Sequence, residues 1–216
     1  MSDYKVLSES QTSHHGGTGK WVKGRARNVK GELMPCRNGL HYCTRDQLVG
    51  WLGPQIWLFE DLSPDETVDG GDKMVTRKGR VVERLETWND MTARLFAADC
   101  AEQALRFIPE SHREPFAAAI SVARGFARGE ISDSERAAAW DAARDAARAA
   151  AGDAAWAAAW AAAWDAAWAA AWDAAWAAAW DAARAAAWAA AGDAARAAAW
   201  AWQTDRLFDY LEGRAA

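Results

Sequence analysis

Between Ala137 and Ala201 the chain repeats a four-residue unit made of three alanines and one tryptophan. Every position whose number is a multiple of four, from Trp140 to Trp200, is Trp, Arg or Gly, and the two positions before it are always Ala. Alanine has the highest helix propensity of all residues. The repeat therefore predicts helix along most of its length.

Two glycines interrupt this repeat. Gly152 and Gly192 are each followed by an aspartate, which pairs a residue that commonly ends helices with one that caps them. We therefore expect helices near 133–151, 153–191 and 193–212. The alternative is one continuous helix that tolerates each glycine at a cost of about 1 kcal/mol.

The tryptophans of the middle helix cannot share one flat face. Four residues of an α-helix advance by about 400°, so each tryptophan lies about 40° around the axis from the one before. Their aromatic surface exceeds about a thousand Å², more than the patches of about 300–600 Å² that soluble monomers expose. We expect a right-handed supercoil or helices on several sides, and burial within the domain, against copies of the chain or against a partner. The residues predicted to form this packing or interaction surface are Trp156, Trp160, Trp164, Trp168, Trp172, Trp176 and Trp180.

The first part of the chain has the shorter apolar runs and turn residues of a β-rich module. Strands are expected at Tyr4–Leu7, 39–43, Ile56–Phe59 and Met74–Leu85. Thr44 can cap a short helix that reaches Leu52. Further helices are expected near 90–108 and 112–129, where Pro109 ends the first and Ser111-x-x-Glu114 opens the second. The sequence thus predicts an α+β protein with a β-rich domain over 1–86 and a helical domain over 87–216.

Charge and cysteine content indicate the cellular compartment of the protein. The net charge is −5, and the three cysteines, Cys36, Cys43 and Cys100, lack the spacing of a disulfide framework, which favours a reducing cytoplasm. Aspartates interrupt the Ala/Trp stretch every eight residues from Asp165 to Asp181, which disfavours a membrane span. The polar first ten residues do not indicate a signal peptide. We expect a cytoplasmic protein that does not bind membranes.

One cluster has the residue types of a metal site. Cys36, His41 and Cys43 lie close in sequence, with His14 and His15 upstream, and a strand would place His41 and Cys43 on one face. Structural zinc sites have paired C-x2–4-C spacing, which this cluster lacks. The cluster is a weak candidate for metal binding or catalysis. The alternative is that these residues are a half-buried Cys and His at a turn. We expect no cofactor.

A basic segment offers a third reading. Residues Lys20–Lys30 carry five cations and Trp21, a combination that suits nucleic-acid binding or simply a solvated sheet face. The preceding Gly-Gly-Thr-Gly-Lys20 lacks the form of a phosphate-binding loop, because Trp21 follows the lysine. No Ser/His/Asp set and no carboxylate pair suggests a reaction, which leaves the cluster of Cys36, His41 and Cys43 as the alternative for an enzymatic site.

Motifs in the first 86 residues resemble a domain of unknown function from bacteriophages of actinobacteria. Its recurring core is a Cys, then Gly-x-His, then a short helix. The matching segments are Tyr4-Lys-Val-Leu, His14-His-Gly-Gly, Trp21, Cys36-Arg-Asn-Gly-Leu-His41, Leu48-x2-Trp51-Leu and Asp72-Lys-Met-Val-Thr-Arg-Lys. The resemblance implies a phage gene and no particular activity.

Residues 99–151 resemble a helical family of immunity proteins from polymorphic toxin systems. The matching segments are Asp99-Cys-Ala-Glu, Ala118-Ala-Ile and Ala127-Arg-Gly-Glu. This resemblance implies that the protein binds another protein, although the tryptophan expansion departs from the family. Together the patterns predict a non-enzymatic, phage-encoded accessory protein that acts by self-assembly or by binding a host or phage protein. A metal or enzymatic site at Cys36, His41 and Cys43 and nucleic-acid binding through Lys20–Lys30 are the alternatives.

Overall fold

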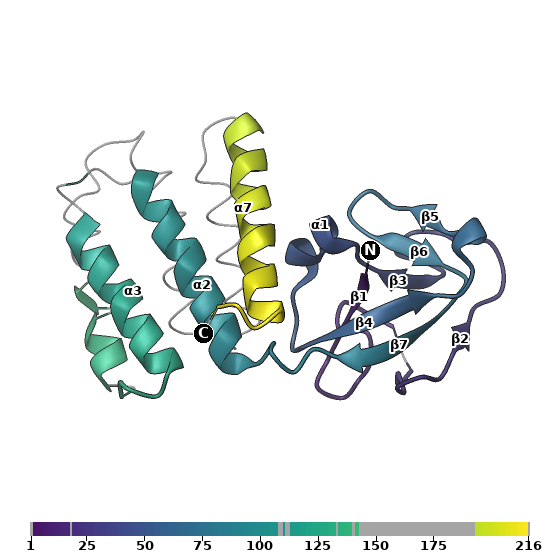
Figure 1. Ribbon diagram of the computed structural model, residues 1–216, viewed down its shortest axis with the longest axis horizontal. Coiled ribbons are helices and arrows are strands. Elements are labelled where there is room, and N and C mark those ends of the chain that lie inside the picture. Colours follow the sequence, from purple (N-terminus) through teal and green to yellow (C-terminus); the bar gives the residue numbers. More distant parts are fainter. Residues whose placement is uncertain are drawn as a thin grey trace. The chain divides into compact units, whose positions relative to one another are not determined.

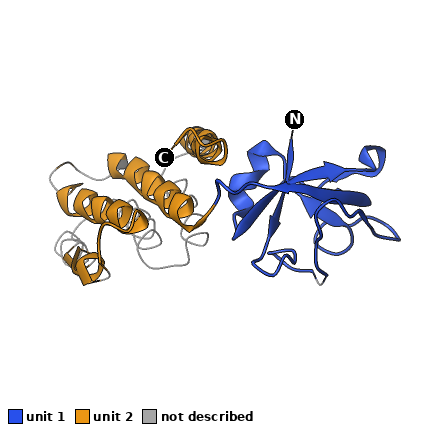
Figure 2. Cartoon of the chain, turned by 60° about the horizontal axis from the view of Figure 1, so that its bottom comes forward, with its two compact units in different colours: residues 1–88 blue, residues 89–216 orange. Residues whose placement is uncertain are grey.

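The computed structural model describes residues 2–17, 19–107, 110, 113–132, 134–139, 141–142 and 193–215. The chain forms two units, residues 1–88 and 89–216, which are coloured separately in Figure 2. Antiparallel sheets occupy the first unit and helices the second, so the predicted α+β class is confirmed. Several predictions concern residues outside the described ones. These are the helix over 153–191, the glycines Gly152 and Gly192, and the seven tryptophans from Trp156 to Trp180.

Two antiparallel sheets build the first unit (Figure 1). The larger has the order β1-β4-β7-β2, and its strands are β1 (Asp3–Leu7), β4 (Gln55–Asp61), β7 (Lys78–Arg84) and β2 (Arg27–Asn28). The smaller has the order β3-β6-β5, and its strands are β3 (Leu40–Tyr42), β6 (Met74–Thr76) and β5 (Val68–Asp69). The strands predicted at Tyr4–Leu7, 39–43 and Ile56–Phe59 are therefore confirmed.

The strand predicted over Met74–Leu85 is wrong as a single element. The structure divides it at Arg77, so that β6 pairs within the smaller sheet and β7 within the larger. Arg77 lies where the chain passes between sheets, and its guanidinium donates to the carbonyl of Gly31 while its own carbonyl accepts from Val29. Apolar alternation continues across this bend, and for that reason the pattern alone did not locate it.

Backbone hydrogen bonds and one carboxylate join the two sheets. Tyr4 on β1 and Cys43 after β3 exchange both backbone hydrogen bonds, each 2.8 Å long. Asp61 at the end of β4 accepts hydrogen bonds from the Tyr42 hydroxyl and, at 2.6 Å, from the Thr76 hydroxyl of the smaller sheet. The buried core beside this junction contains Leu7, Trp21, Leu40, Tyr42, Trp57, Phe59 and Val81.

The short helix predicted after Thr44 is present. Helix α1 spans Arg45–Leu48 and continues as a 3₁₀ turn over Val49–Trp51. Thr44 is its N-cap, and the Thr44 amide donates to the Gln47 side chain at 3.0 Å, which forms half of a capping box. The turn places Trp51 beside the residues that follow β1.

The second unit contains α2 (Asp90–Ala104), α3 (Arg113–Ala127) and α7 (Asp193–Leu211) among its described elements, with α2 between the other two (Figure 1). Helix α2 ends four residues before the predicted 108, because a 3₁₀ turn over Leu105–Phe107 follows it. Ser132 and Glu135 form a capping box, in which the Ser132 amide donates to Glu135 at 2.9 Å. Residues 134–139 and 141–142 are helical.

Asp99 on α2 links this helix to α3 and α7. Its buried carboxylate accepts hydrogen bonds from Arg124 on α3 at 2.7 Å and from Arg206 and Tyr210 on α7 at 2.6 and 2.7 Å. Apolar side chains complete the contact, and Leu207, Phe208, Tyr210 and Leu211 of α7 are all buried. Within the described part of the chain, no helix has the length and apolar character needed to cross a membrane.

Candidate ligand-binding cavity

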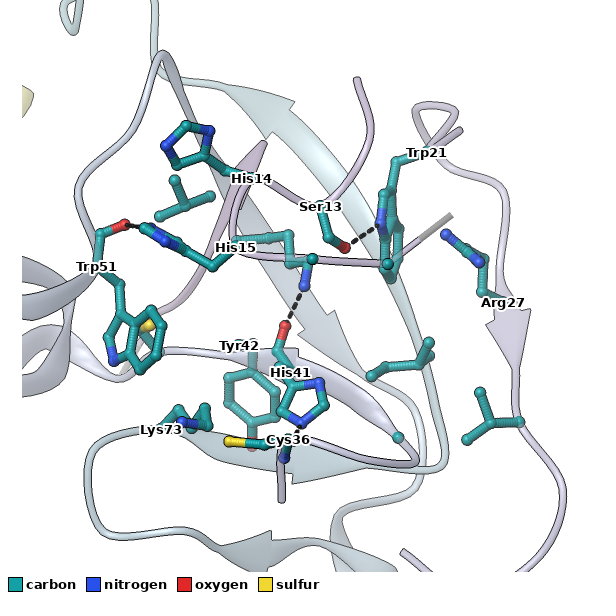
Figure 3. Close-up of a pocket in the computed structure, with 18 of the residues that line it drawn as sticks. Ser13, His14, His15, Trp21, Arg27, Cys36, His41, Tyr42, Trp51 and Lys73 are labelled. Carbon is teal, nitrogen blue, oxygen red and sulfur yellow. Dashed lines mark hydrogen bonds between the residues drawn. The ribbon is translucent and has the colours of Figure 1, made fainter. Parts of the chain in front are cut away.

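A cavity of about 340 Å³ opens in the first unit, between β1, the loop after it and β3 (Figure 3). Ligand pockets usually measure about 300–1,000 Å³, so this cavity can hold a small molecule. Four cationic side chains line it, and no Asp or Glu is among the described residues of its wall. The residues that line it and carry polar chemistry are Lys5, Ser13, His14, His15, Trp21, Arg27, Cys36, Arg37, His41, Tyr42, Cys43, Trp51 and Lys73.

Lys5 is the most unusual of these residues, because it is only 5 % exposed although it carries an ammonium group. It lies on β1 between Tyr4 and Val6, and its Nζ donates to the carbonyl oxygen of His41. Burial lowers the pKa of Lys5 to about 8, with a smaller contribution from the charge of Arg27. Among the described residues no carboxylate pairs with the Lys5 ammonium, so its charge faces the cavity without a counter-ion.

Trp21 and Arg27 form one wall beside Lys5. The Trp21 ring is 2 % exposed, and its indole N–H donates to the Ser13 hydroxyl at 3.2 Å. Lys5 Nζ lies 5.2 Å and the Arg27 guanidinium 4.7 Å from the Trp21 ring centroid, which is the geometry of cation–π contacts. Such contacts hold two cations close together and leave their positive charge uncancelled.

Trp51, His15 and Lys73 form the opposite wall. Lys73 Nζ lies 4.2 Å from the Trp51 ring centroid and is bonded to the Asp72 carboxylate at 3.0 Å. His15 meets the same indole edge-on, with ring centroids 5.0 Å apart, and its Nε2 lies 3.2 Å from the Trp51 carbonyl oxygen. Chain segments far apart in sequence are thereby fixed around one opening.

The third side is a tight turn that carries Cys36. The Met34 amide bonds back to Asn38 at 2.8 Å, and Cys36 within this turn has a φ of 63°, in the left-handed region that non-glycine residues rarely adopt. The Cys36 amide donates to His41 Nε2 at 3.0 Å, which leaves the proton of a neutral His41 ring on Nδ1. Gly39 follows at φ 143°, where any side chain would collide with Val75.

The histidines add little positive charge near pH 7. Burial is the largest influence on His14, His15 and His41, and it lowers the pKa of each below the usual 6.5. They are therefore mainly neutral donors and acceptors. The positive potential of the cavity comes from the lysine and arginine side chains.

The metal site proposed for Cys36, His41 and Cys43 is not supported. All three line the cavity, but the described residues contain no group of three or more His, Cys, Asp and Glu side chains able to hold a metal ion. His41 Nε2 already accepts the Cys36 amide, and burial raises the pKa of Cys43 to about 12, which disfavours the thiolate that metals bind. The cationic wall also repels a metal ion.

The basic segment Lys20–Lys30 does not combine its charges with an exposed aromatic ring. Lys20, Lys23 and Lys30 are exposed, whereas Trp21 is buried in the core and Arg27 is held against it. A buried indole offers no face on which a base could stack. The structure therefore assigns Trp21 and Arg27 to the cavity wall.

Sequence reasoning singled out Cys36, His41, His14 and His15 but missed Lys5, Lys73 and Trp51. A signal for Lys5 exists, because a lysine inside the apolar run of Tyr4-Lys-Val-Leu belongs to a strand that is buried along nearly its whole length. No known protein family, curated protein or solved structure matches this chain. The two family resemblances remain expectations.

Proposed function

We propose that the first unit binds a small anionic molecule, with a carboxylate or phosphate group, in the cavity around Lys5. The observation that carries this proposal is the buried Lys5 ammonium, which has no carboxylate partner among the described residues. Burying an unpaired charge is costly, and a ligand anion would supply the missing counter-ion. The stability lost on burying Lys5 is then recovered when the ligand binds.

The rest of the cavity supports the same chemistry. Arg27 adds a second positive charge, a guanidinium without a carboxylate partner among the described residues, and the Ser13 hydroxyl and His15 ring provide hydrogen-bonding groups. Val6 and Leu40 give the wall an apolar portion. The ligand that fits is a small molecule with one anionic end and an apolar body.

Calorimetry and thermal-shift measurements on the full chain test this proposal. The probes are phosphate, sulfate, benzoate and phenyl phosphate, with benzamide as the neutral analogue of benzoate. We expect an anion to bind and benzamide not to bind, and the order of phenyl phosphate and benzoate distinguishes a phosphate from a carboxylate ligand. Lys5→Met should abolish binding, whereas Lys23→Met, which removes an exposed lysine of the same unit, should leave it unchanged. Equal affinity of Lys5→Met and the parent for the anion would refute the assignment.

We also propose, from the sequence alone, that the tryptophan repeat mediates association with a second copy or with another protein. The supporting observation is the run of seven tryptophans at every fourth position from Trp156 to Trp180, since large aromatic residues dominate interface energetics. The resemblances to a bacteriophage domain and to immunity proteins support an accessory protein of this kind in the host cytoplasm.

Light scattering after size-exclusion chromatography tests self-association. We expect an oligomer that weakens when Trp160, Trp168 and Trp176 are replaced by alanine. A pull-down from infected cells with both chains tests a foreign partner. The second proposal is refuted if the unmodified chain stays monomeric and captures no protein whose binding depends on these tryptophans.

A further inference from the structure

We propose that Cys36 is a nucleophile that attacks an electrophilic carbon of an anionic ligand held in the cavity and so binds it covalently. This inference rests on the proposed anion site, because Lys5 is what brings the charged ligand to the thiol. The substrate class is a small carboxylate or phosphate compound that carries an alkylating carbon.

The surroundings of the three cysteines separate Cys36 from the others. Cys43 and Cys100 are buried, and burial raises the pKa of both thiols. Cys36 is exposed and lies on the cavity wall, so a ligand can reach its sulfur. Reactive cysteines are typically accessible thiols in positively charged surroundings, and of these three cysteines only Cys36 meets both conditions.

Lys73 supplies the positive charge next to the sulfur. In Figure 3 the Cys36 sulfur points toward the Lys73 side chain. Burial alone would lower the pKa of Lys73, but hydrogen bonds to Asp72 and to Cys36 outweigh it and raise that pKa, so the group stays an ammonium ion. Asp72 and the Trp51 ring hold this ammonium in place. The Lys73 ammonium is therefore fixed on the cavity wall beside the Cys36 sulfur.

The backbone fixes the direction of the Cys36 side chain. A φ of 63° is a strained conformation for a residue with a Cβ, and such strain is retained where surrounding bonds enforce it. The bond from the Cys36 amide to His41 Nε2 enforces it here, together with the tight turn between Met34 and Asn38. Strained backbone at an exposed nucleophile is known from other enzymes, in which it presents the reacting atom to the substrate.

The proposed step is a displacement at carbon. The Cys36 Sγ thiolate forms a bond to the electrophilic carbon as the bond from that carbon to its leaving group breaks, and the leaving group departs with the electron pair. The thiol gives up its proton to solvent. The Lys73 ammonium lies beside the sulfur, and Lys5 and Arg27 hold the carboxylate or phosphate of the ligand.

Iodoacetate and iodoacetamide provide matched probes, because they share one reacting carbon and one leaving group, iodide, but only iodoacetate is an anion. The rate of alkylation at Cys36 is measured on the full chain by peptide mass spectrometry, in buffer and in denaturing urea. We expect the iodoacetate-to-iodoacetamide rate ratio to be about tenfold higher in the folded chain than in urea, since charged clefts concentrate ions of opposite sign. Cys36→Ser should remove the label.

Variants test the anion site and the Cys36 nucleophile separately. Lys73→Met should slow both reagents about tenfold, and Lys73→Arg should restore part of the rate, because the charge near the sulfur is kept. Lys5→Met should lower only the iodoacetate preference. Fast labelling by both reagents with a ratio that Lys5→Met does not change would overturn the anion site but not the nucleophile. Labelling of Cys36 no faster than in urea with either reagent would overturn the nucleophile itself.

Discussion

Replacing Lys5 by methionine removes an ammonium group that the folded first unit buries without a described carboxylate partner. Burial lowers the pKa of Lys5 from 10.5 to about 8. Each pKa unit corresponds to about 1.4 kcal/mol, so the charged form costs the folded protein about 3 kcal/mol relative to the unfolded chain. Methionine fills a similar volume without this cost.

The pH dependence follows from the same shift. Below pH 8 both the folded and the unfolded protein hold the Lys5 proton, so the full cost is present. Between pH 8 and 10.5 the unfolded chain binds a proton that the folded one does not, and the free energy of unfolding therefore rises with pH. Above pH 10.5 Lys5 is neutral in both the folded and the unfolded protein, so burying its charge no longer lowers the free energy of unfolding. Lys5→Met should be more stable than the parent by about 1–3 kcal/mol at pH 7, because the lost hydrogen bond to His41 reduces the gain, and the two should converge toward pH 10.

Urea unfolding of the first unit can be followed through Cys43, which is buried in that unit. A brief pulse of maleimide labels Cys43 only where the unit has unfolded, and mass spectrometry counts the labelled fraction at each urea concentration. Lys23→Met is the control and should match the parent within about 0.5 kcal/mol. The reasoning is refuted if Lys5→Met is less stable than this control at pH 7, or if its advantage grows between pH 7 and 9.

Two further predictions concern stability. Asp99→Ala removes the acceptor of the Tyr210 hydroxyl and the more buried carboxylate partner of Arg124 and Arg206, which keep Glu102 and Asp209. It should lower the unfolding free energy of the second unit by about 2–4 kcal/mol in urea melts. Glu102→Ala, at a mainly exposed pair, should cost less than about 1 kcal/mol, and equal losses would contradict the role of Asp99. Gly79→Ala places a Cβ against the Phe59 ring in the core and should lower the midpoint of the first unit by an amount equivalent to about 1–3 kcal/mol. A melting curve unchanged from the parent would show that Phe59 can move aside.

Local patterns predicted much of the first unit. The apolar strand Tyr4–Leu7 and the Thr44 cap depend on neighbours in sequence, and the structure confirms both. The single strand expected over Met74–Leu85 failed, since the bend at Arg77 depends on carbonyl groups more than forty residues away. The cavity is a similar case, because spacing brings Cys36 and His41 together but does not reveal the lysines beside them.

The sequence by itself determined the α+β class, the strands at Tyr4–Leu7 and Ile56–Phe59, the short helix after Thr44 and the tryptophan period, because propensity, capping and apolar alternation act over a few residues. Only the tertiary structure decided that Lys5, Cys36 and Lys73 face one cavity, and that Asp99 accepts bonds from two other helices. The partners of Asp99 lie up to 111 residues from it in the chain. The effect of each charge depends on its distance from other groups and on its burial, and both are set by the folded structure.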